Sequence, residues 1–134
     1  MGLASRTGIA LIGGIFVRLF DVAGNLHLHT VASDGTGTHN EVARAAAQAG
    51  LDFLVYTDHN TWVEGVAGWY CEPETGRRIL RLMGQELHDK SREPEVNHLL
   101  CQFVESDLNH VVEDPQMLID TAHRKGGLTF LAHP

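Results

Sequence analysis

Residues 25–60 read NLHLHTVASDGTGTHNEVARAAAQAGLDFLVYTDHN, and this stretch predicts two strands joined by a helix. Residues 25–30 would alternate in side-chain direction if extended, and the turn-forming residues 33–37 follow them. Residues 51–57 form a short apolar run with aromatic and branched members, as in a parallel strand that is buried on both faces.

The helix between these strands has recognisable signals at both ends. Thr38 and Glu41 fit a capping box, in which the side chain of each residue accepts a hydrogen bond from the backbone N–H of the other. An alanine-rich segment follows, and Gly50 stands where a left-handed residue commonly ends a helix. The first unit is therefore predicted to be β-α-β.

Three further strands are predicted at residues 79–87, 98–104 and 128–132. A helix precedes the last of them. It begins at Asp114-Pro115, the residue types preferred at the N-cap and N1 positions, and ends at Gly126. The chain would thus contribute about five strands to an α/β fold.

Two connections lack a helical pattern. Residues 61–78 show no sustained period and carry Gly, Pro and both Trp, so we predict an irregular insertion with at most one helical turn. Residues 88–97 contain Pro94 and no apolar period. This favours an antiparallel hairpin over a crossover helix, and a hairpin would bring His98 beside Glu86.

Length and composition restrict the possible functions. The 134 residues, 43% of them hydrophobic, form at most one domain with an ordinary core. Ten basic against seventeen acidic residues give a formal charge of −7, which argues against a surface built to grip nucleic-acid phosphates. Nine histidines nearly equal the basic residues in number, and histidine is a common metal ligand.

The compartment and the N-terminal segment are predicted from weaker signals. Cys71 and Cys101 are too few and too isolated for a disulfide framework, so we predict free thiols and a cytoplasmic location. Residues 8–17 are apolar but end well short of the ~18 residues of a membrane span. Residues 1–24 are predicted to be a leader or an upstream strand segment; a mis-assigned start and a signal peptide behind Arg6 are the alternatives.

Side chains suited to metal binding lie at almost every predicted strand end. His27 and His29 are two apart on one strand, so both rings would point to the same face and could bind one ion. This pair alone is a weak signal, because paired histidines also occur without metal. At the other strand ends stand Asp34, Asp58, His59, Glu86, His98 and His133. Active sites of βα architectures gather at such an edge, so the set predicts a metal site there.

Five motifs occur together in this chain: His27-Leu28-His29-Thr30, Ser33-Asp34-Gly35, Thr57-Asp58-His59-Asn60, Gly84-Gln85-Glu86 and Ala132-His133-Pro134. In this combination, residues 25–134 resemble the PHP (polymerase and histidinol phosphatase) domain family. Gly24-Asn25 before the first histidine pair and the G-x-E-L-H string are most similar to the carbaryl-hydrolase-like metallohydrolase branch of that family.

The resemblance implies a distorted TIM-like (β/α)7 barrel with two or three divalent ions, usually Zn, Mn or Fe, at one end. The implied ligands are His27 and His29 for one ion, Glu86 as a bridge, His98 and His133 for the second ion, and Asp34 and His59 for a third. Glu86, Asp58 and His59 are the predicted catalytic residues, and Asp58 would act by orienting a ligand or the loop.

The family also supplies an Asp-x-His pair from its last strand, and this chain ends before that pair. Residues 25–134 are therefore expected to be the N-terminal part of a PHP metallohydrolase domain without its C-terminal strands. Five strands cannot close a seven-stranded barrel, so we expect an open edge unless the missing segment or another chain covers it.

The implied function is hydrolysis of a phosphoester in a small molecule by metal-activated hydroxide. Two alternatives remain: hydrolysis of a carbamate, ester or amide at the same metal site, and a truncated or structural PHP module without catalysis. An amidohydrolase is less favoured, because Thr57-Asp58-His59 at the second strand end is not its pattern. No nucleic-acid or membrane partner is predicted.

The remaining polar and aromatic residues are given ordinary roles. His88 is predicted to be a solvent-exposed loop residue, although it lies two residues past Glu86 and could face the site. Structural or solvated roles are predicted for His39, His110 and His123, and solvated loop charges for Arg77, Arg78, Lys90 and Arg92. Trp62, Trp69 and Tyr70 could form either an aromatic wall for a substrate or a small satellite core.

Overall fold

The computed structural model describes residues 7–93 and 98–133, so Arg6, Pro94 and Pro134, which were named above, lie outside it. In chain order the elements are β1 (Thr7–Ile12), β2 (Ile15–Phe20), β3 (Gly24–Asn25), α1 (His39–Ala49), β4 (Phe53–Tyr56), β5 (Gly68–Cys71), β6 (Arg78–Leu87), β7 (Leu99–Gln102), the short helix η1 (Asn109–Val111), α2 (Pro115–Arg124) and β8 (Leu128–Leu131).

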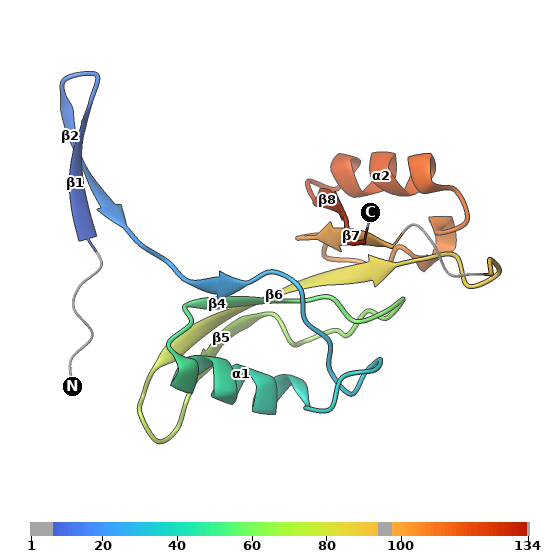
Figure 1. Ribbon diagram of the computed structural model, residues 1–134, viewed down its shortest axis with the longest axis horizontal. Helices are drawn as coiled ribbons and strands as arrows, with labels where there is room; N and C mark the ends of the chain where they lie inside the picture. The colour runs from blue at the N-terminus through green and yellow to red at the C-terminus, as the bar shows by residue number, and fades with distance from the viewer. Residues whose placement is uncertain (1–6, 94–97, 134) are drawn as a thin grey trace.

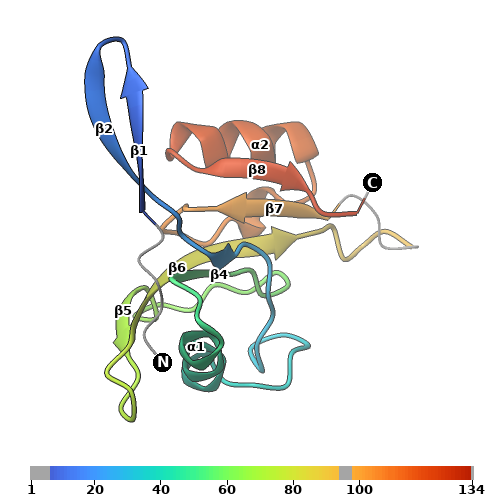
Figure 2. The ribbon, with the colours of Figure 1, turned by 60° about the vertical axis from the view of Figure 1, so that its left-hand side comes forward.

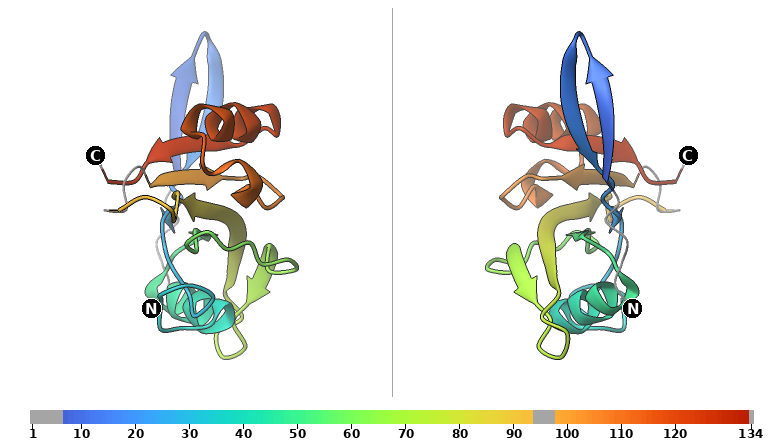
Figure 3. Two further views of the ribbon diagram at one scale, coloured as in Figure 1. Left: turned by 90° about the vertical axis from the view of Figure 1, so that its right-hand side faces the viewer. Right: turned by 90° about the vertical axis from the view of Figure 1, so that its left-hand side faces the viewer.

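The main sheet has the strand order β3-β4-β6-β7-β8, and β5 pairs with β6 beside this path. Strands β3, β4 and β6 are parallel, whereas β7 is antiparallel to both β6 and β8. Figure 2 shows β8, β7, β6 and β4 side by side, with α2 and α1 at the two ends. The strands curl into a half-barrel (Figure 3), so the α/β class and the five predicted strands are confirmed.

Both helices begin where the sequence predicts. Thr38 is the N-cap of α1 and forms the complete capping box with Glu41, and Gly50 follows the helix in the left-handed conformation with φ 92°. The side chain of Asp114 accepts a hydrogen bond from the backbone N–H of Met117 at the start of α2. These local signals are sufficient to place both helices.

The core consists of two clusters, one at each end of the sheet. In the first, the alanines of α1 pack against Leu54 of β4 and Ile79 of β6. In the second, Leu118 of α2 packs with Leu87 of β6 and Cys101 of β7. Strand β6 contributes to both clusters and therefore joins the two ends of the molecule.

Two strand predictions differ from the structure. The first strand ends at Asn25, because Leu28 hydrogen-bonds to the backbone and side chain of Thr57 and the regular ladder does not continue. The prediction that residues 61–78 lack a strand is wrong, since β5 pairs antiparallel with β6. This pairing is a hairpin between consecutive strands, but the irregular composition of residues 61–78 does not reveal it.

Strands β1 and β2 form a separate hairpin that projects from the body of the molecule (Figure 1). Gly13 and Gly14 connect the strands with φ of 57° and 83°, as a two-residue hairpin turn requires. An upstream strand was predicted in this segment, and the structure contains two. Large apolar side chains of the hairpin are exposed: Ile9, Leu11, Ile12, Ile15, Phe16, Leu19 and Phe20.

Within the described ranges, no helix has the length and apolar character needed to cross a membrane.

Candidate metal centre

The predicted ligands meet at one edge of the curled sheet. His27 and His29 follow β3, His59 follows β4, and Glu86 lies near the end of β6. Of the other three, Asp34 lies in the loop before α1, His98 directly precedes β7 and His133 lies just beyond β8. Because β7 runs opposite to its neighbours, its first residue lies at the same edge as the last residues of the other strands.

Glu86 is the centre of this group. Its side chain is 0% exposed, and one carboxylate oxygen, Oε2, lies 2.7 Å from His27 Nε2 and 3.1 Å from His29 Nε2. The other oxygen, Oε1, lies 3.0 Å from His98 Nδ1 and 3.4 Å from His133 Nε2. Nδ1 of His59 also lies 3.7 Å from Oε2. The two oxygens thus face different sets of histidines, which is the arrangement expected of a carboxylate that bridges two ions.

Asp34 lies beside a third set of imidazoles. Its carboxylate oxygens are 3.4 Å from His29 Nδ1 and 3.7 Å from His59 Nε2. The loop that carries Asp34 packs tightly, since a Cβ atom on Gly35 would overlap the carbonyl oxygen of His29. Glycine at this position therefore allows the loop to approach the histidine pair closely.

The structure brings all seven predicted ligands together. Their donor atoms form three groups within 4.8 Å: His27, His29 and Glu86; Glu86, His98 and His133; and His29, Asp34 and His59. The first two combinations are the ones that the resemblance implies, and the third contains His29 in addition to the implied Asp34 and His59. Imidazole and carboxylate together suit Zn, Mn or Fe.

The protonation states of the ligands also fit a metal centre. The Nδ1 atoms of His29 and His59 are buried and have no hydrogen-bond partner among residues 7–93 and 98–133. Burial, together with the neighbouring His59, lowers the pKa of His29. Burial acts to raise the pKa of Glu86, but hydrogen bonds from His27 and His98 outweigh it, and the net pKa is lowered. A neutral imidazole and an ionised carboxylate are the forms that bind metal.

Asp58 lies apart from these three groups. Its buried carboxylate accepts hydrogen bonds from the backbone N–H of Thr30 at 2.6 Å and from the Ser33 hydroxyl at 2.8 Å. Both donors belong to the segment that links the first histidine pair to Asp34. Asp58 therefore holds the ligand loop in place.

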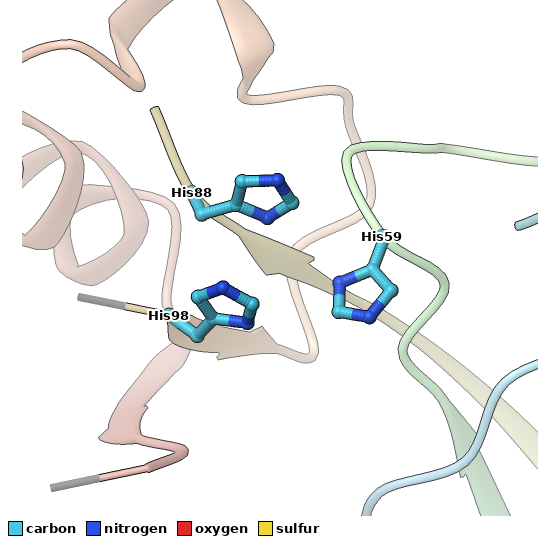
Figure 4. Close-up of side chains that lie close together, drawn as sticks. All are labelled: His59, His88 and His98. Atoms are coloured by element: carbon cyan, nitrogen blue, oxygen red, sulfur yellow. The ribbon is translucent and has the colours of Figure 1, made fainter. Parts of the chain in front are cut away.

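The prediction for His88 is wrong, because this residue is 5% exposed. Figure 4 shows its ring beside those of His59 and His98. The His88 and His98 rings stack with centroids 4.5 Å apart, and His59, His88 and His98 form a fourth group of possible ligands. The signal available in the sequence was the spacing of two from Glu86, which places both side chains on one face of an extended segment.

The remaining residues with predicted roles do not belong to these ligand groups. His110 and His123 are exposed, as predicted. Arg77 donates to the carbonyl of Gly50, and Arg78 lies over the Trp69 ring. Trp62 and Tyr70 pack against the first core cluster, which favours the satellite-core alternative for those two rings.

Comparisons with known proteins give partial matches. No protein-family profile matches the chain. A phosphoribosyl 1,2-cyclic phosphate 1,2-diphosphodiesterase from Eggerthella lenta is 38% identical over 55 residues, which are 41% of this chain and 20% of that protein. A solved structure from Bifidobacterium adolescentis, described as a candidate metal-dependent phosphoesterase, is 27% identical with a TM-score of 0.47 and covers 75% of this chain and 34% of that one. The chain thus spans a minor part of either relative, and its resemblance to the PHP family is confirmed.

Proposed function

We propose that this chain, which resembles the PHP family, carries the metal centre of a phosphoesterase that acts on a small phosphorylated molecule. The observation that carries the proposal is the position of Glu86. A buried carboxylate presents one oxygen to His27 and His29 and the other to His98 and His133. Such a bridge suits a pair of ions that act on the attacking and leaving oxygens of one phosphoester.

The proposed assignment gives each residue one task. His27 and His29 bind one ion with Glu86, and His98 and His133 bind another. Asp34 and His59 provide a third position. These residues would hold Zn²⁺, Mn²⁺ or Fe²⁺, which would lower the pKa of a bound water and so supply hydroxide near neutral pH. The cations also offset the acidic net charge of −7, which would otherwise repel a phosphate.

No covalent nucleophile from the protein is proposed. The hydroxyl of Ser33 donates to Asp58 and thereby serves the loop. Cys101 is buried, and burial raises the pKa of its thiol to about 12, so it stays protonated and unreactive. Cys71 is exposed on β5 and belongs to none of the ligand groups. The unpaired thiols support the proposed cytoplasmic location.

The substrate is proposed to reach the centre by a groove of about 550 Å³ next to His88. The ammonium group of Lys90 lines this groove and can donate hydrogen bonds to phosphate oxygens. The amides of Asn60 and Asn109 already donate to backbone carbonyls, and Asp89 and Glu113 add negative charge to the lining.

The half-barrel is proposed to belong to a (β/α)7 barrel that further strands complete beyond β8. Leu128, Phe130 and Leu131 of β8 are about half exposed, which supports a covering partner on that strand.

The substitution Glu86→Gln tests the proposed function. We expect the variant to bind fewer ions and to lose more than about 100-fold in metal-dependent hydrolysis of p-nitrophenyl phosphate esters, because it removes the shared charged ligand. Metal content and hydrolysis rates are measured on the same samples, and Glu64→Gln at an exposed position is the matched control. Equal metal content and rates in both variants would overturn the proposal. Activity on aryl carbamates alone would favour the carbamate alternative.

A further inference from the structure

His88 has no role in the proposed bridged centre, although it is almost completely buried beside that centre. Its ring centroid lies 5.4 Å from that of His59 and 4.5 Å from that of His98. In Figure 4 the three rings converge from three separate segments of the chain. A histidine in a solvated loop would be exposed, so the burial of His88 against two other imidazoles needs another explanation.

The backbone of His88 is held in place by Asn60. The N–H of His88 donates to Asn60 Oδ1 at 3.0 Å, and Asn60 Nδ2 donates to the carbonyl of His88 at 3.1 Å. Asn60 itself has a positive φ of 46°, and its N–H donates to the carbonyl of Glu86 at 2.9 Å. The turn after β4 is thereby fixed to the end of β6. His88 is positioned by the same contacts that position His59.

The donor atoms of the three rings lie within 4.8 Å of one another. Nδ1 of His59 is buried, lies 3.7 Å from Glu86 Oε2 and makes no hydrogen bond among the described residues. Figure 4 shows one nitrogen of this ring directed toward the other two. Nδ1 of His98 lies 3.0 Å from Glu86 Oε1. If that nitrogen carries the proton, the lone pair is on Nε2. This is the usual tautomer of a metal-binding histidine, in which one nitrogen binds the ion and the other donates to a carboxylate.

We propose that His59, His88 and His98 form an additional metal site made only of imidazoles. Three nitrogen ligands favour Zn²⁺ or a similar transition-metal ion over Mg²⁺ and Ca²⁺, which prefer oxygen ligands. The site shares His59 and His98 with the groups around Asp34 and Glu86. A neutral imidazole has one lone-pair nitrogen, so each shared residue serves one ion at a time. This site concerns metal binding alone and holds whether or not the chain hydrolyses phosphoesters.

Binding requires a rotation of the His88 ring. The planes of His88 and His98 differ by 12°, so the lone pairs of the two rings lie in nearly parallel planes and do not converge on one ion. Rotation about the bond between Cβ and the ring turns a nitrogen of His88 toward the ion, and rotation about such a bond is soft.

The test isolates this site by removing the other three groups. The double variant His29→Ala/Glu86→Gln deletes at least one ligand from each of them and leaves His59, His88 and His98 unchanged. We expect this variant to bind one equivalent of Co²⁺, with the visible absorption bands of a four-coordinate ion, and Zn²⁺ should displace it. The readout is absorption and metal content, so a failure of the proposed hydrolysis does not affect it.

Adding His88→Phe to the double variant distinguishes coordination from stacking. Phenylalanine keeps an aromatic ring against His98 but has no nitrogen, so Co²⁺ affinity should fall by at least about tenfold. His110→Phe at an exposed position outside all four groups is the matched control and should change nothing. If the double variant does not fold, the same His88→Phe and His110→Phe pair is compared in His29→Ala/His133→Ala, which also removes one ligand from each of the other three groups. Absence of Co²⁺ binding, or equal binding with His88→Phe, would overturn the proposal.

Discussion

Glu86 combines two properties that rarely occur together, a negative charge and complete burial. An unpaired buried carboxylate would take up a proton, because burial favours its neutral form. The imidazoles of His27 and His98 hydrogen-bond to it and shift the balance, so its pKa is lowered and it stays ionised at neutral pH. The charge that a bridging ligand needs is therefore present before any ion binds.

His39 predicts a pH dependence of stability. Burial lowers its pKa and Arg81 acts in the same direction, whereas Asp58 opposes them. As pH falls below the unfolded-state pKa of 6.5, the unfolded chain takes up a proton that the folded chain still excludes. Stability from this residue is therefore lost toward acid. We expect His39→Gln to lose less unfolding free energy than the wild type between pH 7.5 and 5.5.

Urea unfolding of the metal-free proteins at both pH values measures this difference. The comparison between the two proteins cancels the contribution of the other histidines, which they share. Parallel loss of stability in both proteins would show that His39 is protonated equally in the folded and unfolded chain.

At the scale of single elements, α1 depends on its first turn. The Thr38 backbone N–H donates to Glu41 Oε2 at 2.8 Å, and the Glu41 N–H donates to the Thr38 hydroxyl at 3.3 Å. Thr38→Ala removes the second bond, so we expect a loss of about 1 kcal/mol in unfolding free energy. Denaturant titration checks this value, with exposed Thr36→Ala in the same loop as control. Equal stability of the two variants would mean that the cap contributes nothing.

The elements that the sequence predicts well are those with local signals. The cap at Thr38, the Gly50 terminus and the Asp114-Pro115 pair each involve neighbouring residues, so both helices could be placed without knowledge of the fold. The β6–β7 hairpin was also predictable, and it accounts for His98 lying beside Glu86.

Features that depend on distant partners could not be predicted in this way. The first strand ends early because Leu28 hydrogen-bonds to Thr57 and the regular ladder stops. Strand β5 is different, since it pairs with the neighbouring β6 and was missed because residues 61–78 show no strand pattern. The burial of His88 follows from its contacts with Asn60 and His98, residues that lie elsewhere in the sequence. Residue types and strand ends therefore indicated which side chains would meet, and packing determined how they meet.

At the scale of the whole molecule, the projecting hairpin and the core should respond differently to substitution. Ile9 is 77% exposed on β1, whereas Leu54 is 1% exposed in the first cluster. We expect Ile9→Thr to change the unfolding free energy by less than about 0.5 kcal/mol. Leu54→Ala should cost about 2–5 kcal/mol because it leaves a cavity. Urea unfolding compares the two. A cost above about 1 kcal/mol for Ile9→Thr would mean that this side chain is covered in solution.

The two core clusters share only strand β6, and the ligand groups lie where they meet. One oxygen of Glu86 faces histidines attached to the first cluster, and the other faces histidines attached to the second. Without cations, the amide hydrogens of α1 and α2 should exchange with solvent through separate local openings of unequal free energy. An ion bound on each side of Glu86 would link the segments of both core clusters to the same carboxylate. Opening of either half would then require release of its ion, and the two halves would unfold as one cooperative unit.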